Sequence, residues 1–231
     1  MAPFSKSAKN NRNVFLSLLL ILVATFFAFS PVFQNDFLKT WDDNRYIIDN
    51  PLIQSLGFSN IAQMFSMVYD GHYHPLTLLS LAIDFQIDGL NPVVFHTTNL
   101  LLHLGNTLLV FWFVFLLFDR KNLSMAVVSA LLFGISTMAV ESVAWASERK
   151  NLLYALFYFV SLISYLKYLK TDKLKFLFLS VFLFLLSLLS KAMALPLVAT
   201  LFAIDLFFGR KPLSWKTILE KLPYLLLAII F

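Results

Sequence analysis

Long apolar runs alternate with short polar segments along the chain, and this alternation predicts a series of membrane-spanning helices. The first run covers about residues 13–33. At about 1.5 Å per residue, a helix of that length crosses a hydrocarbon layer about 30 Å thick. Six more runs of the same character follow: about residues 91–118, 122–139, 151–168, 175–189 and 193–208, with the last from about Leu222. The pattern therefore predicts an all-α polytopic membrane protein.

The polar segments divide the chain into four parts. The expected parts are a cytoplasmic tail at 1–12, a first transmembrane helix at 13–34, an outer loop at 35–90, and the remaining transmembrane helices at 91–231. The last apolar run reaches Phe231 with no flanking charge, so we expect this span to be truncated and further helices or a soluble domain to follow.

The outer loop has structure of its own. Its pattern predicts a short amphipathic helix over residues 58–68 and a second helix from Pro75 to about Ile87, because proline favours the first turn of a helix. The second helix is too short and too polar to cross a bilayer. We expect both helices to lie along the membrane surface.

Composition and charge support this class and set the orientation. The chain is 59% hydrophobic and 13% charged, about half the charge of an ordinary soluble domain. It has no cysteine, which excludes disulfides, Cys-ligated zinc and a thiol nucleophile. Most Lys and Arg residues lie in the tail and in alternate connections; the exceptions are Lys39, Arg45, Arg149, Lys150 and Lys191. This asymmetry predicts a multi-pass protein of the inner (plasma) membrane with a cytoplasmic N-terminus, not a nucleic-acid-binding protein.

Two adjacent carboxylates, Asp42 and Asp43, follow Trp41 just beyond the first span. An acidic side chain at the centre of a membrane helix costs about 2.5–3.5 kcal/mol on insertion scales, so a pair of them is expected in a loop or a hydrated cavity. These two residues are the first candidates for chemistry.

Four polar residues in the second span lie on one helical face: His96, Asn99, His103 and Asn106. The favoured interpretation is hydrogen bonding between helices. A metal site on this face is disfavoured because His96 and His103 are about 10 Å apart along the helix axis. The sequence indicates no firm cofactor, although a divalent metal at His72 and His74 stays open as an alternative.

Cations also gather on the outward side. In the segment 141–150, a helix would place Glu141, Trp145 and Glu148 on one face. The segment ends in Arg149 and Lys150, and Lys191 lies at a later outer turn. One interpretation is that they anchor helix ends at the interface. The other is that they hold an anionic headgroup or a lipid-linked phosphate, since positive charge is otherwise scarce on this side.

Several of these segments together resemble a known family. They are, in chain order, Trp41-Asp42-Asp43-Asn44-Arg45-Tyr46 with Asn50-Pro51, His74-Pro75-Leu76-Thr77, Phe95-His96-Thr97-Thr98-Asn99-Leu100-Leu101-Leu102-His103, Glu141-Ser142-Val143-Ala144-Trp145 with Glu148-Arg149-Lys150, and Ser190-Lys191. Over about residues 30–210 they resemble the membrane half of the bacterial transmembrane and tetratricopeptide-repeat proteins. That family is similar to the GT-C superfamily of glycosyltransferases, which includes protein O-mannosyltransferases.

The resemblance implies a GT-C-like helical bundle with a long first outer loop. It also implies transfer of a sugar from a polyprenyl-phosphate carrier to a hydroxyl of a protein or glycan acceptor on the outer face. In that superfamily an acidic residue of the first outer loop is the base. Carried over, Asp43 is the preferred base and Asp42 its orienting or acceptor-binding neighbour.

The reaction itself requires the same types of residue. Sugar transfer from a lipid phosphate needs a carboxylate to remove the acceptor proton and cations to stabilise the departing phosphate, and a single base predicts inversion at the sugar. The residues expected to bind donor phosphate or substrate are His74, Glu141, Arg149, Lys150 and Lys191, with no metal ligand among them.

One segment departs from the family. Relatives commonly have His-Pro and a second His just before the glutamate, whereas this chain reads Ser136-Thr137-Met138-Ala139-Val140-Glu141. This difference predicts altered specificity or reduced activity. Two other classes therefore remain alternatives: a transporter or flippase of a lipid-linked sugar, and a non-catalytic membrane scaffold for a tetratricopeptide-repeat domain.

Overall fold

The computed structural model describes residues 4–212 and 214–231, with side chains from residue 11 onward. Over the described residues the regular structure is helical, apart from an isolated bridge between Tyr69 and His72. The α-helices are α1 (Phe4–Phe29), α2 (Phe58–Ser66), α3 (Pro75–Asp88), α4 (Pro92–Leu117), α5 (Leu123–Gly134), α6 (Val140–Ala144), α7 (Arg149–Thr171), α8 (Leu174–Ser190), α9 (Leu197–Phe207) and α10 (Trp215–Ile230). This confirms the expected all-α membrane bundle.

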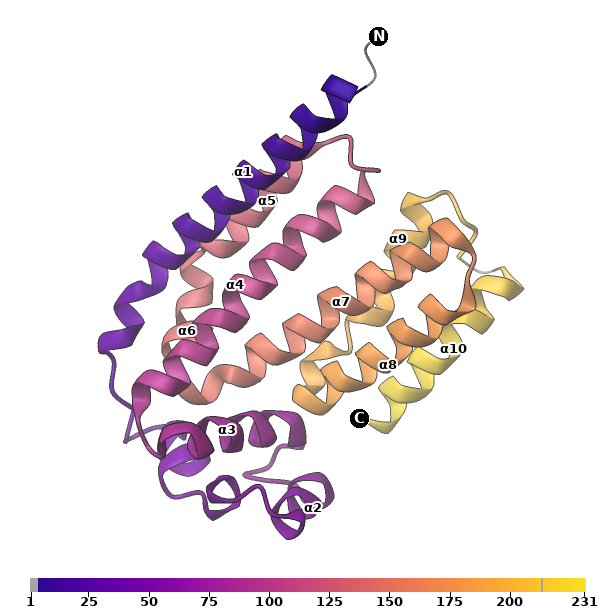
Figure 1. Ribbon diagram of the computed structural model, residues 1–231. Helices are drawn as coiled ribbons and strands as arrows, with labels where there is room; N and C mark the ends of the chain where they lie inside the picture. The colour runs from indigo at the N-terminus through magenta and orange to yellow at the C-terminus, as the bar shows by residue number, and fades with distance from the viewer. Residues whose placement is uncertain (1–3, 213) are drawn as a thin grey trace.

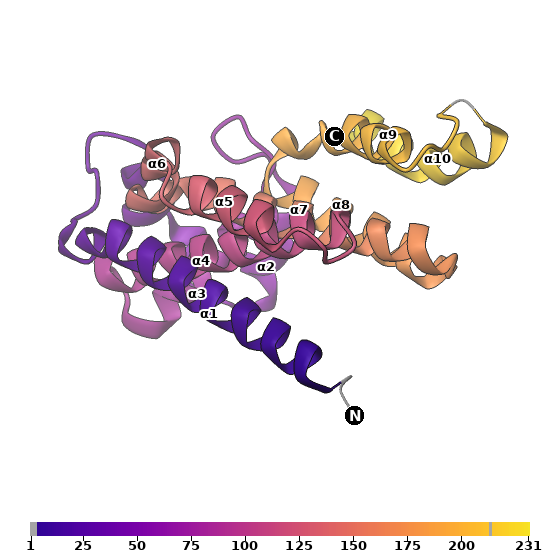
Figure 2. The same ribbon diagram turned by 90° about the horizontal axis from the view of Figure 1, so that it is seen from above.

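The helices α1, α5, α4 and α7 lie side by side (Figure 1). α8 packs along α7, and α9 and α10 cover these two helices on one side (Figure 2). The short helices α2 and α3 cap one end of the bundle (Figure 1). The largest apolar core lies between α7, α8, α9 and α10 and contains Tyr165, Phe184 and Leu201.

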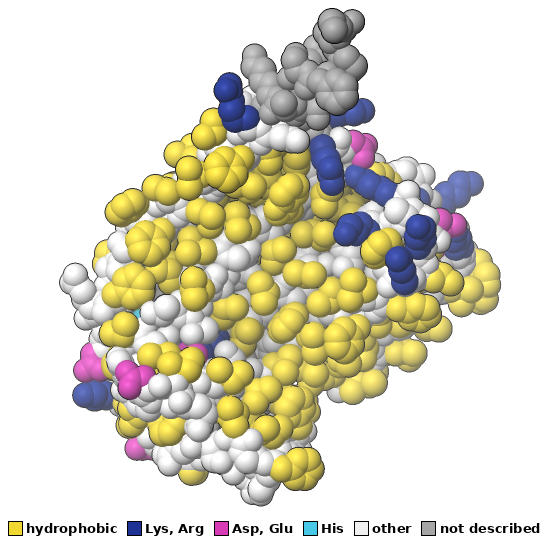
Figure 3. All heavy atoms as spheres, in the orientation of Figure 1, with side chains coloured by type: hydrophobic (Ala, Val, Ile, Leu, Met, Phe, Trp, Pro, Cys, Tyr) yellow, Lys and Arg dark blue, Asp and Glu magenta, His cyan; other side chains and the backbone are white. Residues whose placement is uncertain are grey.

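The bundle has two chemically different ends. We call the end formed by residues 30–91, 135–148 and 191–196 the site end. The opposite end, formed by the start of α1 and by residues 118–122, 172–173, 208–212 and 214, is the basic end. Lys and Arg side chains gather at the basic end, with an apolar surface between the two ends (Figure 3). That distribution is the one expected of a protein that crosses a bilayer.

Within the described part of the chain, three segments are long and apolar enough to span a membrane: Asn11–Gln34, Pro92–Leu117 and Ala146–Thr171. They correspond to three of the predicted spans. The predicted span at 122–139 is instead two helical pieces bent by 48° after Gly134. α8 has 17 residues and α9 has 11, so both are shorter than the roughly 20 residues that a perpendicular crossing requires.

The bounds of the two short helices α2 and α3 agree closely with those predicted from the sequence. α2 ends two residues before the expected boundary, and α3 begins at Pro75 as expected. At the start of α4, the Asn91 side chain accepts the backbone N–H of Val93 and so caps the helix. α1 begins at Phe4, inside the segment expected to be a tail.

The expectation that Glu141, Trp145 and Glu148 share one helical face is wrong. α6 ends at Ala144, and Trp145 has an extended backbone with φ −99° and ψ 118°. Side chains from elsewhere bind the backbone groups that a continuous helix would use. The Asn99 amide donates to the carbonyl of Trp145 at 3.1 Å, and the Asp43 carboxylate accepts the N–H of Ser147 at 2.8 Å.

The polar stripe of α4 is buried and bonds neighbouring helices. The amide of Asn106 donates to the carbonyl of Leu152 at 2.9 Å. The Nε2 atom of His103 lies 2.9 Å from the carbonyl oxygen of Gly134, which ends α5. These contacts confirm the expected hydrogen bonds between helices for His103 and Asn106. Both ring nitrogens of His96 are buried and make no hydrogen bond within the described part of the chain.

Candidate functional site

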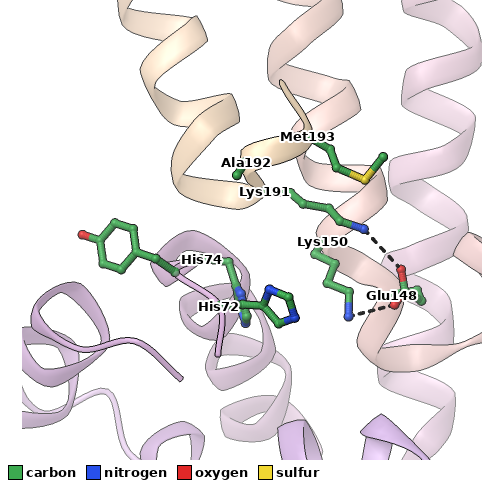
Figure 4. A pocket seen from close by; sticks show the side chains of 8 residues that line it. His72, His74, Glu148, Lys150, Lys191, Ala192 and Met193 are labelled. Carbon is green, nitrogen blue, oxygen red and sulfur yellow. Dashed lines mark ion pairs between the residues drawn. The ribbon is translucent and has the colours of Figure 1, made fainter. Parts of the chain in front are cut away.

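Two adjoining cavities open at the site end. The first, which we call the site pocket, has a volume of about 350 Å³ (Figure 4). Its lining residues are His72, Tyr73, His74, Glu148, Lys150, Lys191, Ala192 and Met193. The second, the side groove, has a volume of about 640 Å³ and runs between α4, α5, α6 and α7. Glu148, Lys191 and Met193 line both cavities, so the two meet at these residues.

A charged cluster lies where the cavities meet. The Glu148 carboxylate is 2.8 Å from Lys150 Nζ and 3.8 Å from Lys191 Nζ, and both ammonium groups point toward it (Figure 4). The amide of Asn151 donates to Glu148 at 2.5 Å, while its oxygen accepts from Lys191 at 2.6 Å. Two cations, one from α7 and one from the turn after α8, therefore lie close together.

Local structure explains this convergence. Glu148 is the residue just before α7 and Lys150 is the second residue of that helix, so both lie at its positive N-terminal end. Lys191 follows the last residue of α8 in an extended conformation, with φ −165°. Burial lowers the pKa of the Lys191 ammonium, and Glu148 opposes that shift.

Asp42 and Asp43 have different surroundings. Asp42 is 38% exposed, and its carboxylate lies 3.5 Å from Lys150 Nζ at the edge of the charged cluster. Asp43 is fully buried, and its two oxygens accept the backbone N–H groups of Leu38 and Ser147 at 2.9 and 2.8 Å. The burial of Asp43 is at odds with the expectation that it faces an acceptor, and Asp42 is the accessible carboxylate.

Arg149 is placed away from both cavities. Its guanidinium is fully buried and lies 2.5 Å from the Asp84 carboxylate on α3. It also donates to the side chain of Asn99 at 2.9 Å and to the carbonyl of Phe95 at 2.8 Å. Because its donors are bound within the protein, a structural role fits this geometry better than contact with a donor phosphate.

His74 and Glu141 lie in different cavities. The ring of His74 lines the site pocket 5.2 Å from the ring of Tyr46, and burial followed by the charge of Lys150 lowers its pKa to about 4. Glu141 lines the side groove with an exposed side chain. Over the residues that the structure describes, no three His, Asp or Glu side chains come together as a metal site.

Three residues of the site were not among the sequence candidates. Glu148 and Asn151 hold the lysines, and the ring of Tyr46 lies 5.0 Å from Lys150 Nζ. A signal for the first two existed, since they flank Arg149 and Lys150 at the start of a helix. Nothing local marks Tyr46, whose neighbour Lys150 is distant in the chain.

The chain is similar in sequence to part of several known protein O-mannosyl-transferases. Protein O-mannosyl-transferase TMTC4 of Homo sapiens is 30% identical over 159 residues, covering 60% of this chain and 21% of the relative. Protein O-mannosyl-transferase TMTC1 of Mus musculus is 33% identical over 96 residues, 40% of this chain and 10% of the relative. Protein O-mannosyl-transferase F38B6.6 of Caenorhabditis elegans is 25% identical over 228 residues, 93% of this chain and 31% of the relative. The curated homologues of this chain are TMTC-family protein O-mannosyl-transferases.

These alignments span only about a tenth to a third of each of the three relatives. No protein-family model matches the chain, and no solved structure matches it. Mannosyl transfer is the activity named for these longer relatives, and the chain aligns with only part of each of them.

Proposed function

We propose that this chain is the membrane part of an inverting glycosyltransferase of GT-C type. In this proposal it moves a sugar from a polyprenyl-phosphate carrier to a hydroxyl group of an acceptor. The observation that carries the proposal is the charged cluster. Lys150 and Lys191 line the site pocket, Lys191 also lines the side groove, and the partly exposed carboxylate of Asp42 lies 3.5 Å from Lys150 Nζ.

The two lysines suit a departing phosphate. Lys150 belongs to α7 and Lys191 follows the last residue of α8. Each ammonium group has three N–H donors, so each can contact a phosphate oxygen while it keeps its contact with Glu148 or Asn151. A pair of preorganised cations stabilises the negative charge that develops on the leaving group. The two ammonium groups would repel each other, but both pair with the carboxylate of Glu148, which keeps them close together.

Asp42 is the proton acceptor in this proposal. It removes the proton of the acceptor hydroxyl while that oxygen forms a bond to the anomeric carbon of the sugar. The bond from the anomeric carbon to the phosphate oxygen breaks, and its electron pair leaves with the phosphate. Attack from the face opposite the phosphate inverts the anomeric centre. Asp43 holds the segment that carries Asp42.

The side groove suits the lipid part of the donor. Among its lining residues Leu132 and Met138 are 69% and 87% exposed, so the groove opens on the apolar surface of the bundle. A prenyl chain entering from the bilayer would lie against these side chains. Its phosphate would then reach Lys191, which belongs to both cavities.

We further propose that the basic end lies in the cytoplasm of a bacterial cell and that the site end faces outward across the inner membrane. The positive-inside rule supports this orientation, because the side chains gathered at the basic end are Lys and Arg. The printed names of the homologues describe protein substrates, so we propose a protein hydroxyl as the acceptor, with a glycan hydroxyl as the alternative.

A transfer assay tests the proposal. Vesicles containing the full-length protein are supplied with polyprenyl phosphate carrying a labelled mannose and with acceptor protein. The proposal predicts label on the acceptor. Label that crosses the bilayer without transfer would indicate a transporter or flippase, and label that does neither would indicate a non-catalytic scaffold; both results would contradict the proposal.

A further inference from the structure

The lining of the side groove is divided between apolar and polar residues. The apolar group includes Leu132, Phe133 and Ala155. The polar group comes from the break after α5, from α6 and from the start of α7, and includes Ser136, Glu141, Ser142 and Asn151. In the proposed function the apolar residues of the groove contact the lipid chain, whereas the polar residues have no assigned ligand.

Several side chains of the polar group have hydrogen-bond donors or acceptors that are not used within the protein. Over the described residues, the exposed Glu141 carboxylate makes no hydrogen bond or ion pair. The Ser142 hydroxyl oxygen accepts from Asn151 at 3.2 Å, which leaves its O–H free to donate. The Ser136 oxygen accepts the N–H of Met138 at 3.2 Å and likewise keeps its own O–H. One strong acceptor and two hydroxyl donors thus line the groove.

The position of the polar group indicates which ligand it binds. Asn151 also bonds Glu148 and Lys191, so the polar group adjoins the proposed phosphate site directly. In a polyprenyl-phosphate sugar, the sugar is bonded to the same phosphate. Sugar hydroxyls both donate and accept hydrogen bonds, which matches a carboxylate beside serine hydroxyls. A lipid phosphate alone would leave these residues unused.

We propose that the polar part of the side groove, which we call the sugar subsite, binds the sugar of the donor, and that Glu141 selects among sugars. This inference rests on the proposed function. A site that hydrogen-bonds a substrate hydroxyl discriminates strongly against an analogue that lacks it, whereas an apolar pocket does not. Glu141 is therefore the specificity-determining residue, and Ser136 and Ser142 orient the ring.

A binding experiment tests the inference independently of turnover. The full-length protein is placed in phosphatidylcholine vesicles, and its affinity is measured for bare polyprenyl phosphate and for the same lipid carrying mannose or glucose. We expect one sugar-bearing lipid to bind the protein at least about tenfold more tightly than bare polyprenyl phosphate, as one added hydrogen bond to a charged group would give. In Glu141→Gln this advantage and the preference between the two sugars should be lost, while affinity for bare polyprenyl phosphate stays the same.

Asp172→Asn is the matched control, because Asp172 is exposed at the basic end and, among the described residues, forms an ion pair with Lys216 alone. It should behave as the unaltered protein. If the unaltered protein binds all three lipids equally, the phosphate site of the proposed function stands and the sugar subsite is wrong. If Glu141→Gln keeps the full advantage of the sugar, Glu141 is not the selecting residue. Failure of the unaltered protein to bind any of the three would contradict both the sugar subsite and the proposed function.

Discussion

The carboxylate of Asp43 accepts the backbone N–H of Ser147, 104 residues away in the chain, at 2.8 Å. Its other oxygen accepts the N–H of Leu38. One buried side chain therefore ties the loop after α1 to the turn before α7. Because that turn leads to Glu148 and Lys150, this bond fixes Asp42 relative to the charged cluster.

Asp43→Asn should lower the free energy of unfolding by about 1–3 kcal/mol, because one buried N–H loses its acceptor. Denaturant titration in mild detergent measures the change. Asp172→Asn is the matched control and should alter stability by less than about 0.5 kcal/mol, since its site is exposed and Asn tolerates its left-handed backbone. An Asp43→Asn protein as stable as the original but unable to transfer sugar would restore Asp43 as the base.

Arg149 and Asp84 form an ion pair that is hidden from solvent, with exposed side-chain fractions of 0% and 3%. Arg149→Met should cost about 3–5 kcal/mol, because it leaves a buried carboxylate without its partner. The double variant Arg149→Met, Asp84→Asn should recover much of that loss. A double-mutant cycle in the same denaturant assay measures the coupling, and strictly additive losses would show that the two residues act separately.

Gly134 of α5 lies against Thr25 of α1 and Thr107 of α4. A Cβ atom at this position would collide with Oγ1 of Thr25 and lie 2.8 Å from Cγ2 of Thr107. Gly134→Ala should therefore destabilise the bundle by about 1–3 kcal/mol. Gly105→Ala is the control: its Cβ would meet Leu156 at an ordinary 3.9 Å, and alanine in a helix is favoured over glycine by about 0.5–1 kcal/mol. Equal melting temperatures for the two variants would refute this packing.

His74 should make stability depend on pH. Its pKa falls to about 4 in the folded protein, mainly through burial, against an ordinary value of about 6.5 in the unfolded chain. Between these values the unfolded chain binds a proton that the folded protein does not, so stability should fall as pH drops from about 6.5 to about 4. His74→Gln should flatten this dependence of the melting temperature. If the melting temperature of His74→Gln depends on pH as strongly as that of the unaltered protein, other groups cause the dependence.

The membrane helices could be predicted from the sequence because their signal is local. An apolar run of sufficient length is visible in any short window, and Pro75 marks a helix start by itself. The break over residues 135–148 could not be predicted in the same way. Its backbone groups are bound by Asp43 and Asn99, which are distant in the chain.

The types of residue in the candidate site could be predicted from the sequence. Which of two neighbouring residues is buried and which lines the site could not. Arg149 and Lys150 are neighbours in sequence, yet adjacent positions on a helix point about 100° apart. Arg149 therefore turns inward to Asp84, whereas Lys150 lines the site pocket. The same holds for Asp42 and Asp43, of which only the first stays accessible.

The rate of sugar transfer by Asp42→Asn, measured in vesicles with a labelled polyprenyl-phosphate mannose, tests the central claim most directly. Removing the proton acceptor should lower the rate by about 10²–10⁴-fold, while donor affinity and the melting temperature change little. Asp36→Asn is the matched control, since Asp36 lies in the same loop, pairs with the exposed Lys39 and accepts the N–H of its neighbour Phe37, a bond that the Asn oxygen can keep. Transfer by Asp42→Asn at the rate of the unaltered protein would contradict the assignment of Asp42 as the base.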